Sequence, residues 1–448
     1  MEKIVSLCKR RGFVYQSGEI YGGLNGCWDY GPLGSELKKN LKDFWWKRTV
    51  RDRDDILGLD GTILTHQEVL KASGHVGGFS DPMVDCKVCK SRYRADAVPD
   101  TPCKEKLSLP KGEDKSCELT EPREFNLMFQ TQMGASAGAD AVAYLRPETA
   151  QTIFVQFKNV LDSSRVKLPF GIAQMGKAFR NEINPRNFTF RSREFEQMEI
   201  EYFCRPEDGM RLTDEWLEKR LAFYGEIGIP REKLHILDVP DGERAHYSKK
   251  TYDIEYEFPF GIQELEGVAY RTDYDLGKHQ ECSGKPMEYF DEATKEKFIP
   301  HVVEPSAGAD RTVLALICEA FDEEEITSDK GKVETRTVLR FKPRMAPIKI
   351  GVFPLLKNKP DLVAKAKEIQ ALLRDHVTTF YDETGAIGRR YRRQDEVGTP
   401  YCVTIDFDTI GENGPEHDGT VTIRERDSMK QERVKIDDLL GYLLPKLV

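Results

Sequence analysis

The stretch from Ala178 to Phe203, AFRNEINPRNFTFRSREFEQMEIEYF, combines four arginines and five glutamates with aromatic residues and contains no lysine. Arginine offers a rigid fork of donors that fits a phosphate bidentately, whereas lysine is a point charge. A phenylalanine ring and a guanidinium can also stack on the two faces of a flat base. This combination favours a site for a nucleoside polyphosphate. The alternative is a solvated hairpin whose charges pair across its strands.

A second candidate site lies between Phe298 and Phe321, in FIPHVVEPSAGADRTVLALICEAF. The pattern predicts a strand, a turn of small residues and a helix that begins at Asp310. Arg311 would lie in the first helical turn, where backbone amides attract anions, and Gly308 would let the backbone approach a ligand. The alternative is a strand-to-helix corner with a surface arginine.

A third candidate is Glu148, in the stretch YLRPETAQTIFVQF. It follows a proline where a predicted strand gives way to an amphipathic helix. Glutamate at a helix start is ordinarily a cap, but here it could also be a carboxylate directed into a pocket.

Two antiparallel strands should position the charged residues of the first stretch. Side chains alternate faces along a strand, so Met198, Ile200 and Tyr202 should pack on a core. The opposite face would carry Phe195, Gln197, Glu199 and Glu201. The loop NPRNFTFRS is too long for a two-residue turn; it carries Arg186 and Arg191, and Arg193 follows directly. No G-x-x-x-x-G-K-S/T sequence occurs, so a nucleotide site here would not be a P-loop.

Composition narrows the class of protein. The chain has 448 residues, enough for two or three domains, and its net charge of −9 leaves RNA contacts to local patches. No apolar run reaches the length of a membrane helix, and no signal peptide is recognisable at the start. The ten cysteines lack a framework spacing, which favours a reducing, cytoplasmic location.

Further segments flank the candidate sites. SELKKNLKDFWWKRTV has helical apolar spacing with Ser35 as a candidate cap, and FKPRM (341–345) resembles a linker. Beyond it, strand-like and helical stretches alternate, which predicts a small α/β domain with a mainly parallel sheet. Residues 85–123 form a predicted inserted lobe with Cys86, Cys89, Cys103 and Cys117. Cys86 and Cys89 have the spacing of one half of a zinc site. The other two cysteines are far apart in the sequence, so a metal-free lobe is favoured.

Several stretches resemble class II aminoacyl-tRNA synthetases. Arg180 to Glu182 with the loop to Arg193, and Gly308 to Arg311, resemble the second and third signature motifs, and the helix ending in DFWWKR resembles the weaker first motif. More specifically, the chain is similar to the glycyl-tRNA synthetases of the homodimeric type. The matching stretches are EIYGGLNGCWDYGPLG, ASGHVGGFSDPMVDC, REFNLMF, RPETAQ, LPFGIAQMGKAFRNEI, FTFRSREFEQME, YRTDYDL and EPSAGADR.

The resemblance implies an α+β catalytic domain at residues 1–340, with an antiparallel sheet flanked by helices and the cysteine-containing lobe inserted at about 85–123. It implies that residues 341–448 form a C-terminal α/β domain that binds the anticodon. The chain departs from the family in two places: it has FGIQELEG where GWGEL is frequent, and its lobe lacks a second close cysteine pair.

Carried over by position, Arg180 would hold the ATP α-phosphate and the attacking carboxylate, and Arg311 would hold the γ-phosphate. Glu182 would lie near the adenine, Phe195 would stack on it, and Glu264 is the candidate magnesium contact. The full set of implied ATP positions is Arg180, Asn181, Glu182, Phe190, Arg191, Ser192, Arg193, Glu194, Phe195, Glu264, Leu265, Gly308, Ala309, Asp310 and Arg311. Arg180 and Arg311 are the implied catalytic residues.

Glycine would be held mainly by Glu148, Glu199, Glu304 and Ser306, because it has no side chain to recognise and carboxylates can surround its ammonium group. Arg94 and Arg271 are candidates for its carboxylate side. The full set of implied glycine positions is Arg94, Glu148, Phe195, Glu196, Gln197, Met198, Glu199, Arg271, Glu304, Pro305, Ser306, Ala307 and Gly308.

The implied reaction has two steps: glycine and ATP form glycyl-adenylate, and the glycyl group then moves to the 3′ end of its tRNA. Magnesium would accompany ATP, structural zinc is not expected, and the family suggests a cytoplasmic homodimer with no membrane contact. The best basic cluster for tRNA is IGRRYRRQDE, with Arg389, Arg390, Tyr391, Arg392 and Arg393; the alternative is a solvated helix face. Two rival functions are a non-catalytic accessory or regulatory protein on this scaffold, and a class II synthetase for another amino acid.

Overall fold

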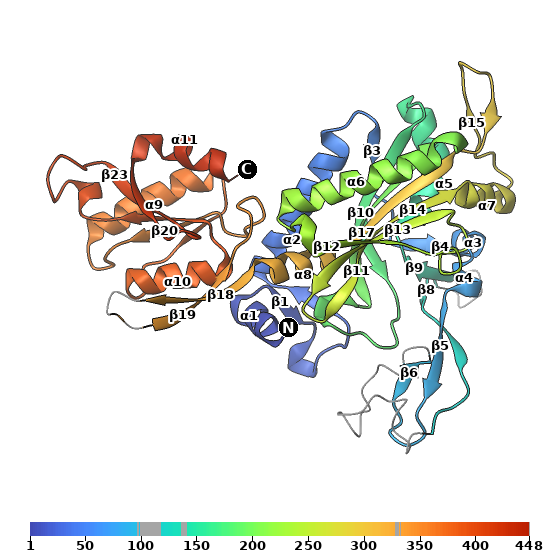
Figure 1. The fold of residues 1–448 in the computed structure, drawn as a ribbon, viewed down its shortest axis with the longest axis horizontal. Helices are drawn as coiled ribbons and strands as arrows, with labels where there is room; N and C mark the ends of the chain where they lie inside the picture. The colour runs from blue at the N-terminus through green and yellow to red at the C-terminus, as the bar shows by residue number, and fades with distance from the viewer. Residues whose placement is uncertain (96–97, 99–117, 136–140, 328–330, 332, 448) are drawn as a thin grey trace.

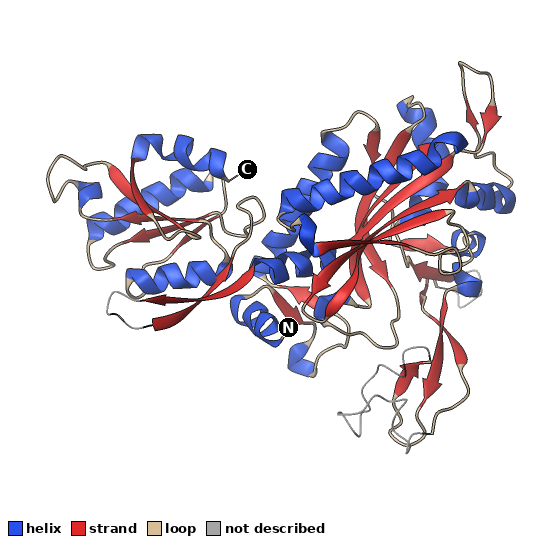
Figure 2. Cartoon of the chain, in the orientation of Figure 1, coloured by secondary structure: helices blue, strands red, loops and turns tan. Residues whose placement is uncertain are grey.

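The computed structural model describes residues 1–447 except 96–97, 99–117, 136–140, 328–330 and 332 (Figures 1 and 2). Two bodies lie side by side in Figure 1, a larger one that holds the N-terminus and a smaller one that holds the C-terminus. None of the described helices is long and apolar enough to cross a membrane.

The larger body is built on a seven-stranded sheet in the order β12-β13-β14-β17-β11-β10-β3. Neighbouring strands are antiparallel, except that the short edge strand β3 is parallel to β10. The bounds are β3 Ile56–Gly58, β10 Phe170–Phe179, β11 Glu194–Cys204, β12 Leu234–Asp238, β13 Lys250–Phe258, β14 Gly261–Thr272 and β17 His301–Gly308. The predicted antiparallel sheet flanked by helices is therefore confirmed.

The predicted strand pair forms β10 and β11, which pair from Phe170 opposite Phe203 to Phe179 opposite Glu194. Met198, Ile200 and Tyr202 are buried in the main hydrophobic core, as their alternation predicted. Three helices complete this core: α2 (Pro32–Trp46), α6 (Gly209–Ile227) and α8 (Ala309–Ala320).

Helix α2 begins earlier than its sequence suggested. Its first residue is Pro32 and its N-cap is Gly31, so the expectation that Ser35 caps the helix is wrong. Proline has the backbone φ of a helix built in and needs no amide donor in the first turn, so the Pro-Leu-Gly segment starts the helix.

A second core lies beneath α5 (Ala150–Ser164) and α7 (Tyr274–Ser283), against residues of β10, β11 and β17. Smaller elements surround the large sheet. They are α1 Glu2–Arg11, β1 Val14–Gln16, β2 Trp28–Tyr30, β4 Leu64–His66, α3 Gln67–Ala72, α4 His75–Gly78, β8 Phe129–Gln132, β9 Val142–Leu145, β15 Tyr289–Phe290 and β16 Lys297–Phe298. The predicted lobe projects from the body as a sheet of β5 Ser80–Asp85, β6 Arg92–Arg94 and β7 Arg123–Asn126 (Figure 1).

Helix α8 continues directly into the hairpin β18 (Phe321–Thr327) and β19 (Val333–Leu339), which extends towards the smaller body (Figure 1). The predicted linker that follows is not exposed. Phe341 and Met345 are buried in the main core with Ala346, and the Asn40 amide donates to the Met345 and Ala346 carbonyls. The segment is thus part of the larger body.

The smaller body has a five-stranded sheet in the order β21-β20-β22-β23-β24, with bounds β20 Ile350–Pro354, β21 Thr379–Tyr381, β22 Tyr401–Ile405, β23 Thr420–Glu425 and β24 Gln431–Lys435. Strand β20 is parallel to β21 and β22, but β23 and β24 are added antiparallel. The predicted α/β class is confirmed, whereas the sheet is mixed instead of mainly parallel. Its helices are α9 Pro360–Arg374, α10 Ile387–Val397 and α11 Leu439–Leu443.

Helix α10 contains the basic cluster predicted to meet tRNA, and the structure corrects part of that prediction. Arg390 is buried and donates to the carbonyls of Pro354, Leu355 and Asp382. Tyr391 is also buried and bonds to Thr404, so it is not available to stack on a base. Buried guanidinium groups here satisfy carbonyls of the neighbouring strand end, which helical spacing alone could not reveal.

Candidate active site

A pocket opens on the sheet face that carries Gln197 and Glu199, at the N-terminal end of α8. Strands β11, β14 and β17 form its floor, and the loop between β10 and β11 forms one rim. The predicted site residues that line it are Glu148, Arg180, Glu182, Phe190, Arg191, Ser192, Phe195, Gln197, Glu199, Glu264, Leu265, Arg271, Glu304, Ser306, Gly308, Asp310 and Arg311.

Guanidinium groups gather at one end of this pocket. Arg311 donates to the carbonyls of Phe190 and Glu264, forms a 3.1 Å ion pair with the Glu264 carboxylate, and lies 4.4 Å from the centre of the Phe190 ring. Arg180 donates to the Pro147 carbonyl and lies 5.4 Å from the Phe195 ring centre. Each arginine is therefore held beside an aromatic ring.

The positive charge at this end is only partly balanced. Burial lowers the pKa of Arg191, and so do the neighbouring guanidinium groups of Arg94, Arg311 and Arg186, against the opposing effect of Glu182. Closely spaced like charges repel one another. A bound polyanion would remove that repulsion, so this end of the pocket is suited to phosphates.

Carboxylates gather at the other end. Glu199 accepts hydrogen bonds from Thr149 and, at 2.8 Å, from Ser306. Glu148 accepts from Gln151 at 2.9 Å and has the His75 ring nitrogen at 3.4 Å. Glu304 forms a bidentate pair with Arg271, with both oxygens 2.9 Å from Nη1.

These acids influence one another's ionisation. Burial raises the pKa of Glu304 to about 8, and Glu199 and Glu148 add to the shift against the effect of Arg271. Burial, and then Glu148, also raises the pKa of Glu199. Burial opposes the ionisation of Glu148 as well, yet His75 and Arg271 lower its pKa overall. The negative charge of this cluster could therefore be compensated by a small bound cation.

Glu201 lies behind this cluster and is fully buried. Its carboxylate oxygens have no hydrogen-bond partner among the described residues. Oxygens of Glu199, Glu201 and Glu304 lie within 4.8 Å of one another. Burial and the nearby Glu304 raise the pKa of Glu201 well above its usual range. Glu201 therefore favours the protonated form behind the cluster.

Several predicted site residues lie outside the pocket lining. Met198 and Ala307 belong to the main core, and the Glu196 carboxylate pairs with Lys38 and Lys42 of α2. Arg193 donates to the carbonyls of Glu182 and Asn25, and so joins the loop to the N-terminal segment. The remaining four described positions outside the lining are Asn181, Glu194, Pro305 and Ala309.

The two arginines predicted for the glycine carboxylate have different surroundings. Arg271 is almost fully buried, and its three nitrogens donate to Glu304 and Asp275 at 2.7–2.9 Å. Arg271 lines the pocket and each of its nitrogens already has a carboxylate partner, so its expected contact with the glycine carboxylate stays a prediction. Arg94, on β6, forms a 3.3 Å ion pair with Asp81 and contributes to the positive potential at Arg191.

Sequence reasoning missed other residues of the site. Tyr247 lines the pocket, and the Arg271 guanidinium lies 3.9 Å from its ring centre. His75 and Asp275 each hold a predicted site residue. Asp275 could have been suspected from its i+4 spacing to Arg271, whereas Tyr247 and His75 come from separate loops and short helices with no distinguishing pattern.

The residues at the phosphate end fit a hard cation such as magnesium, which prefers carboxylate and phosphate oxygens. Glu264 is half-exposed at the pocket edge, and the charge of Arg311 lowers its pKa. On the neighbouring strand, burial raises the pKa of Asp253 to about 7, and the charge of Glu264 adds to the shift. Two adjacent carboxylates are thus present where a nucleotide-bound metal would lie.

The cysteine lobe is described only in part, since Cys103 and Cys117 lie outside the described residues. The Cys89 amide faces the Cys86 sulfur at 3.5 Å. Hydrogen bonds from Tyr93 and Ser91 outweigh burial and lower the pKa of Cys89 to about 6. Among the described residues, neither cysteine belongs to a group of three metal-ligand side chains.

Comparisons with known proteins agree with this geometry. Residues 136–321 match the tRNA synthetase class II core domain (G, H, P, S and T), and residues 349–446 match an anticodon binding domain. A glycine–tRNA ligase from Treponema denticola is 53% identical over 99% of this chain and 96% of the relative. The chain belongs to the glycine–tRNA ligase family. Other family members from Borreliella burgdorferi and Rhodopirellula baltica are 52% and 46% identical, each over the whole of this chain and at least 98% of the relative.

Proposed function

We propose that this chain ligates glycine to its tRNA, first forming glycyl-adenylate from glycine and ATP and then transferring the glycyl group. The observation that carries the proposal is the polarity of one pocket. Arg180, Arg191 and Arg311 gather at one end, and Glu148, Glu199 and Glu304 at the other. Such a pocket can hold a polyphosphate and an ammonium group side by side.

In the first step, an oxygen of the glycine carboxylate bonds to the α-phosphorus while the bond to the β-phosphate breaks and pyrophosphate leaves. Arg180 binds the α-phosphate and the attacking carboxylate, and Arg311 binds the γ-phosphate. Alignment and charge neutralisation carry most of such a reaction. Magnesium, held from the side of Glu264, would neutralise further phosphate charge. Phe195 stacks on the adenine, with Glu182 at its edge.

In the second step, a ribose hydroxyl at the tRNA 3′ end attacks the glycyl carbonyl carbon and AMP leaves. The C-terminal body would bind the anticodon of the same tRNA. We assign the ammonium group of glycine to Glu148, Glu199 and Glu304, with Ser306 fixing Glu199. Glu199 and Glu304 are buried, Glu148 is largely buried, and each is held by a hydrogen-bond donor, so a larger amino acid would meet a rigid wall.

We also propose that the protein is a cytoplasmic homodimer. An apolar surface that a second copy could cover includes Ile63, Leu64 and Met133, whose exposed fractions are 37%, 44% and 54%. Sedimentation velocity on the full chain tests this, and a concentration-independent monomer would refute it.

A non-catalytic role is not favoured, because the predicted phosphate arginines and glycine-facing carboxylates are all present in the chain.

Glycine-dependent exchange of pyrophosphate into ATP tests the proposed activity directly. Each of the standard amino acids is offered in turn, and exchange should occur with glycine alone. Charging of bulk tRNA with labelled glycine tests the second step. Exchange with a different amino acid, or the absence of any exchange while ATP binds, would overturn the proposal.

A further inference from the structure

Helix α10 makes contacts that its sequence did not suggest. Arg389 is exposed, but the buried side of the helix packs against the β18–β19 hairpin of the larger body (Figure 1). Two consecutive acidic residues near its C-terminal end, Asp395 and Glu396, receive arginines from two different parts of that body.

The first contact is fully buried. Arg336 of β19 and Asp395 of α10 have side chains that are 0% exposed, and the Arg336 Nε lies 2.9 Å from the Asp395 carboxylate. Arg424 of β23 binds the same carboxylate at 2.8 and 3.1 Å from within the smaller body. Arg336 also donates to the Arg426 carbonyl, so two of its three partners belong to the smaller body; the third is the Glu324 carboxylate of β18.

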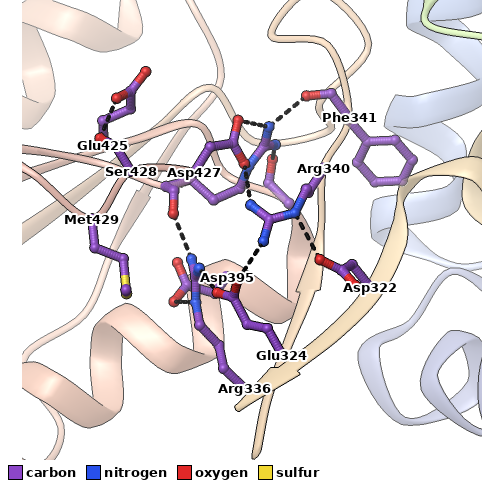
Figure 3. A network of polar contacts seen from close by, with 12 residues as sticks. Asp322, Glu324, Arg336, Arg340, Phe341, Asp395, Glu425, Asp427, Ser428 and Met429 are labelled. Carbon is purple, nitrogen blue, oxygen red and sulfur yellow. Dashed lines mark hydrogen bonds and ion pairs between the residues drawn. The ribbon is translucent and has the colours of Figure 1, made fainter. Parts of the chain in front are cut away.

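A second layer of ion pairs surrounds this contact (Figure 3). Arg340 binds Asp322 and Glu324 of β18 and, at 3.1 Å, Asp427 of the smaller body. Arg426 donates to the Phe341 carbonyl at 2.8 Å. The two residues that directly follow the hairpin, Arg340 and Phe341, are therefore both bound to the smaller body.

The third contact comes from helix α1. Arg11 donates to Glu396 at 2.7 Å and Arg10 at 3.1 Å. Helix α10 is thus held from the hairpin and from α1, two elements that meet it from different parts of the larger body. Such a two-point attachment restricts rotation of the smaller body more than a single ion pair could.

The attached hairpin is also continuous with the pocket. Helix α8 carries Arg311 in its first turn and ends at Ala320, and β18 begins at Phe321 with no intervening loop. The element that holds the smaller body is therefore the direct extension of the element that holds a phosphate arginine.

We propose that Arg336 and Asp395 are positioning residues for the transfer step. They fix the smaller body relative to the pocket, so that a tRNA bound at its anticodon presents its 3′ end to the adenylate. The inference rests on the proposed function, since it requires a tRNA that spans both bodies. A misplacement of about 1 Å at a reacting centre can cost about 100-fold in rate, so loosening this attachment should slow transfer.

The test compares full-length Asp395→Asn and Arg336→Gln with the unchanged protein in three assays: pyrophosphate exchange, tRNA charging and filter binding of tRNA. We expect exchange and tRNA affinity to stay within about twofold, and kcat for charging to fall ~10- to 100-fold. Asp406→Asn is the matched control, because Asp406 binds Arg433 at 2.6 Å wholly inside the smaller body. It should leave the kcat for charging largely intact.

Three outcomes would overturn the inference: unchanged charging in both variants, loss of tRNA affinity that accounts for the whole decrease in charging, or parallel loss of exchange. If Asp395→Asn does not fold, Arg340→Gln and Glu396→Gln take its place, because their side chains are partly exposed at 29% and 23%. Failure of the proposed function gives a different result, since the unchanged protein would then show no glycine-dependent exchange or charging.

Discussion

At the scale of single residues, buried acids outnumber buried bases at the amino-acid end of the pocket. Glu199, Glu201 and Glu304 lie together, and Arg271 is already shared between Glu304 and Asp275. A buried carboxylate without a compensating cation takes up a proton. The empty site should therefore retain protons that an incoming ammonium group displaces.

This exchange of a proton for an amine predicts a pH dependence. The pKa of Glu304 is raised to about 8, mainly by burial, so below that pH the acid is protonated in the empty site. We expect the KM for glycine in pyrophosphate exchange to fall as the pH rises to about 8, by up to roughly tenfold per pH unit, and then to level off. Calorimetric titration of glycine in two buffers of different ionisation enthalpy should detect proton release. A KM that stays constant between about pH 6.5 and 8 would count against the assignment.

Replacement of a single carboxylate tests the same site. Glu304→Gln keeps the shape but removes a charge-assisted bond of about 1.5–3 kcal/mol, so the KM for glycine should rise roughly 10- to 100-fold. The KM for ATP should change little, because Glu304 lies at the opposite end from the arginines. Glu243→Gln, at an exposed position, serves as the control. Equal losses for both substrates would place Glu304 outside the ammonium site.

The sequence predicted the residue types of this site better than their connections. Arginines beside phenylalanines left a polyphosphate site and a solvated hairpin open, and the glutamates of the glycine end were implied by the family resemblance. The partner of Arg271 that could not be predicted is Glu304, because it lies 33 positions away. The carboxylates of Glu304 and Asp275 meet at Arg271 only when β14, α7 and β17 are assembled.

At the scale of elements, Lys38 connects the helix and the strand that position Arg311. It lies on α2, is largely buried, and binds Asp310 of α8 at 2.8 Å and Glu196 of β11 at 3.0 Å. Asp310 also accepts hydrogen bonds from the Tyr30 hydroxyl and the Glu196 amide, each at 2.6 Å. The first turn of α8 is thereby fixed to the sheet.

Lys38→Met should leave the buried Asp310 carboxylate without its cation, whereas Glu196 keeps Lys42. Breaking a buried pair in this way costs about 3–5 kcal/mol, so we expect a lower free energy of unfolding in urea and a higher KM for ATP as Arg311 loses its support. Lys39→Met is the matched control on the same helix, because Lys39 is 63% exposed and pairs with an exposed Asp43. If both variants unfold at the same urea concentration, Lys38 does not have the structural role assigned to it.

Elements were predictable where one face is apolar and the other is polar. The alternation along β11 gave its core face correctly. Helix α10 shows the limit of such predictions. Its arginines have helical spacing, but the sequence cannot distinguish a solvated guanidinium from one that donates to buried carbonyls. Arg390 does the latter with Pro354 and Leu355, which lie 36 and 35 positions away.

At the scale of the whole molecule, the boundary between the two bodies differs from what composition suggested. FKPRM has the proline and charges of a linker, yet Phe341 and Met345 are only 2% and 1% exposed and belong to the core of the larger body. This burial could not be predicted, because core residues of the same cluster, such as Phe13 and Leu37, come from distant segments. The structure therefore favours a division of the chain near residue 348, just before the smaller body's first strand.

Two truncations distinguish the boundary positions. A chain ending at Ile348 keeps the buried segment, so it should fold, catalyse glycine-dependent pyrophosphate exchange and fail to charge tRNA, having lost the surface that binds the anticodon. A chain ending at Arg340 also loses Phe341 and Met345. Removing large buried apolar side chains costs about 2–5 kcal/mol each, so this shorter chain should be unstable and lose exchange as well. Exchange rates and urea unfolding midpoints measure both effects. Equal stability and exchange in the two chains would mean that 341–348 is a linker after all, and efficient charging by the longer one would mean that the smaller body is not needed to bind tRNA.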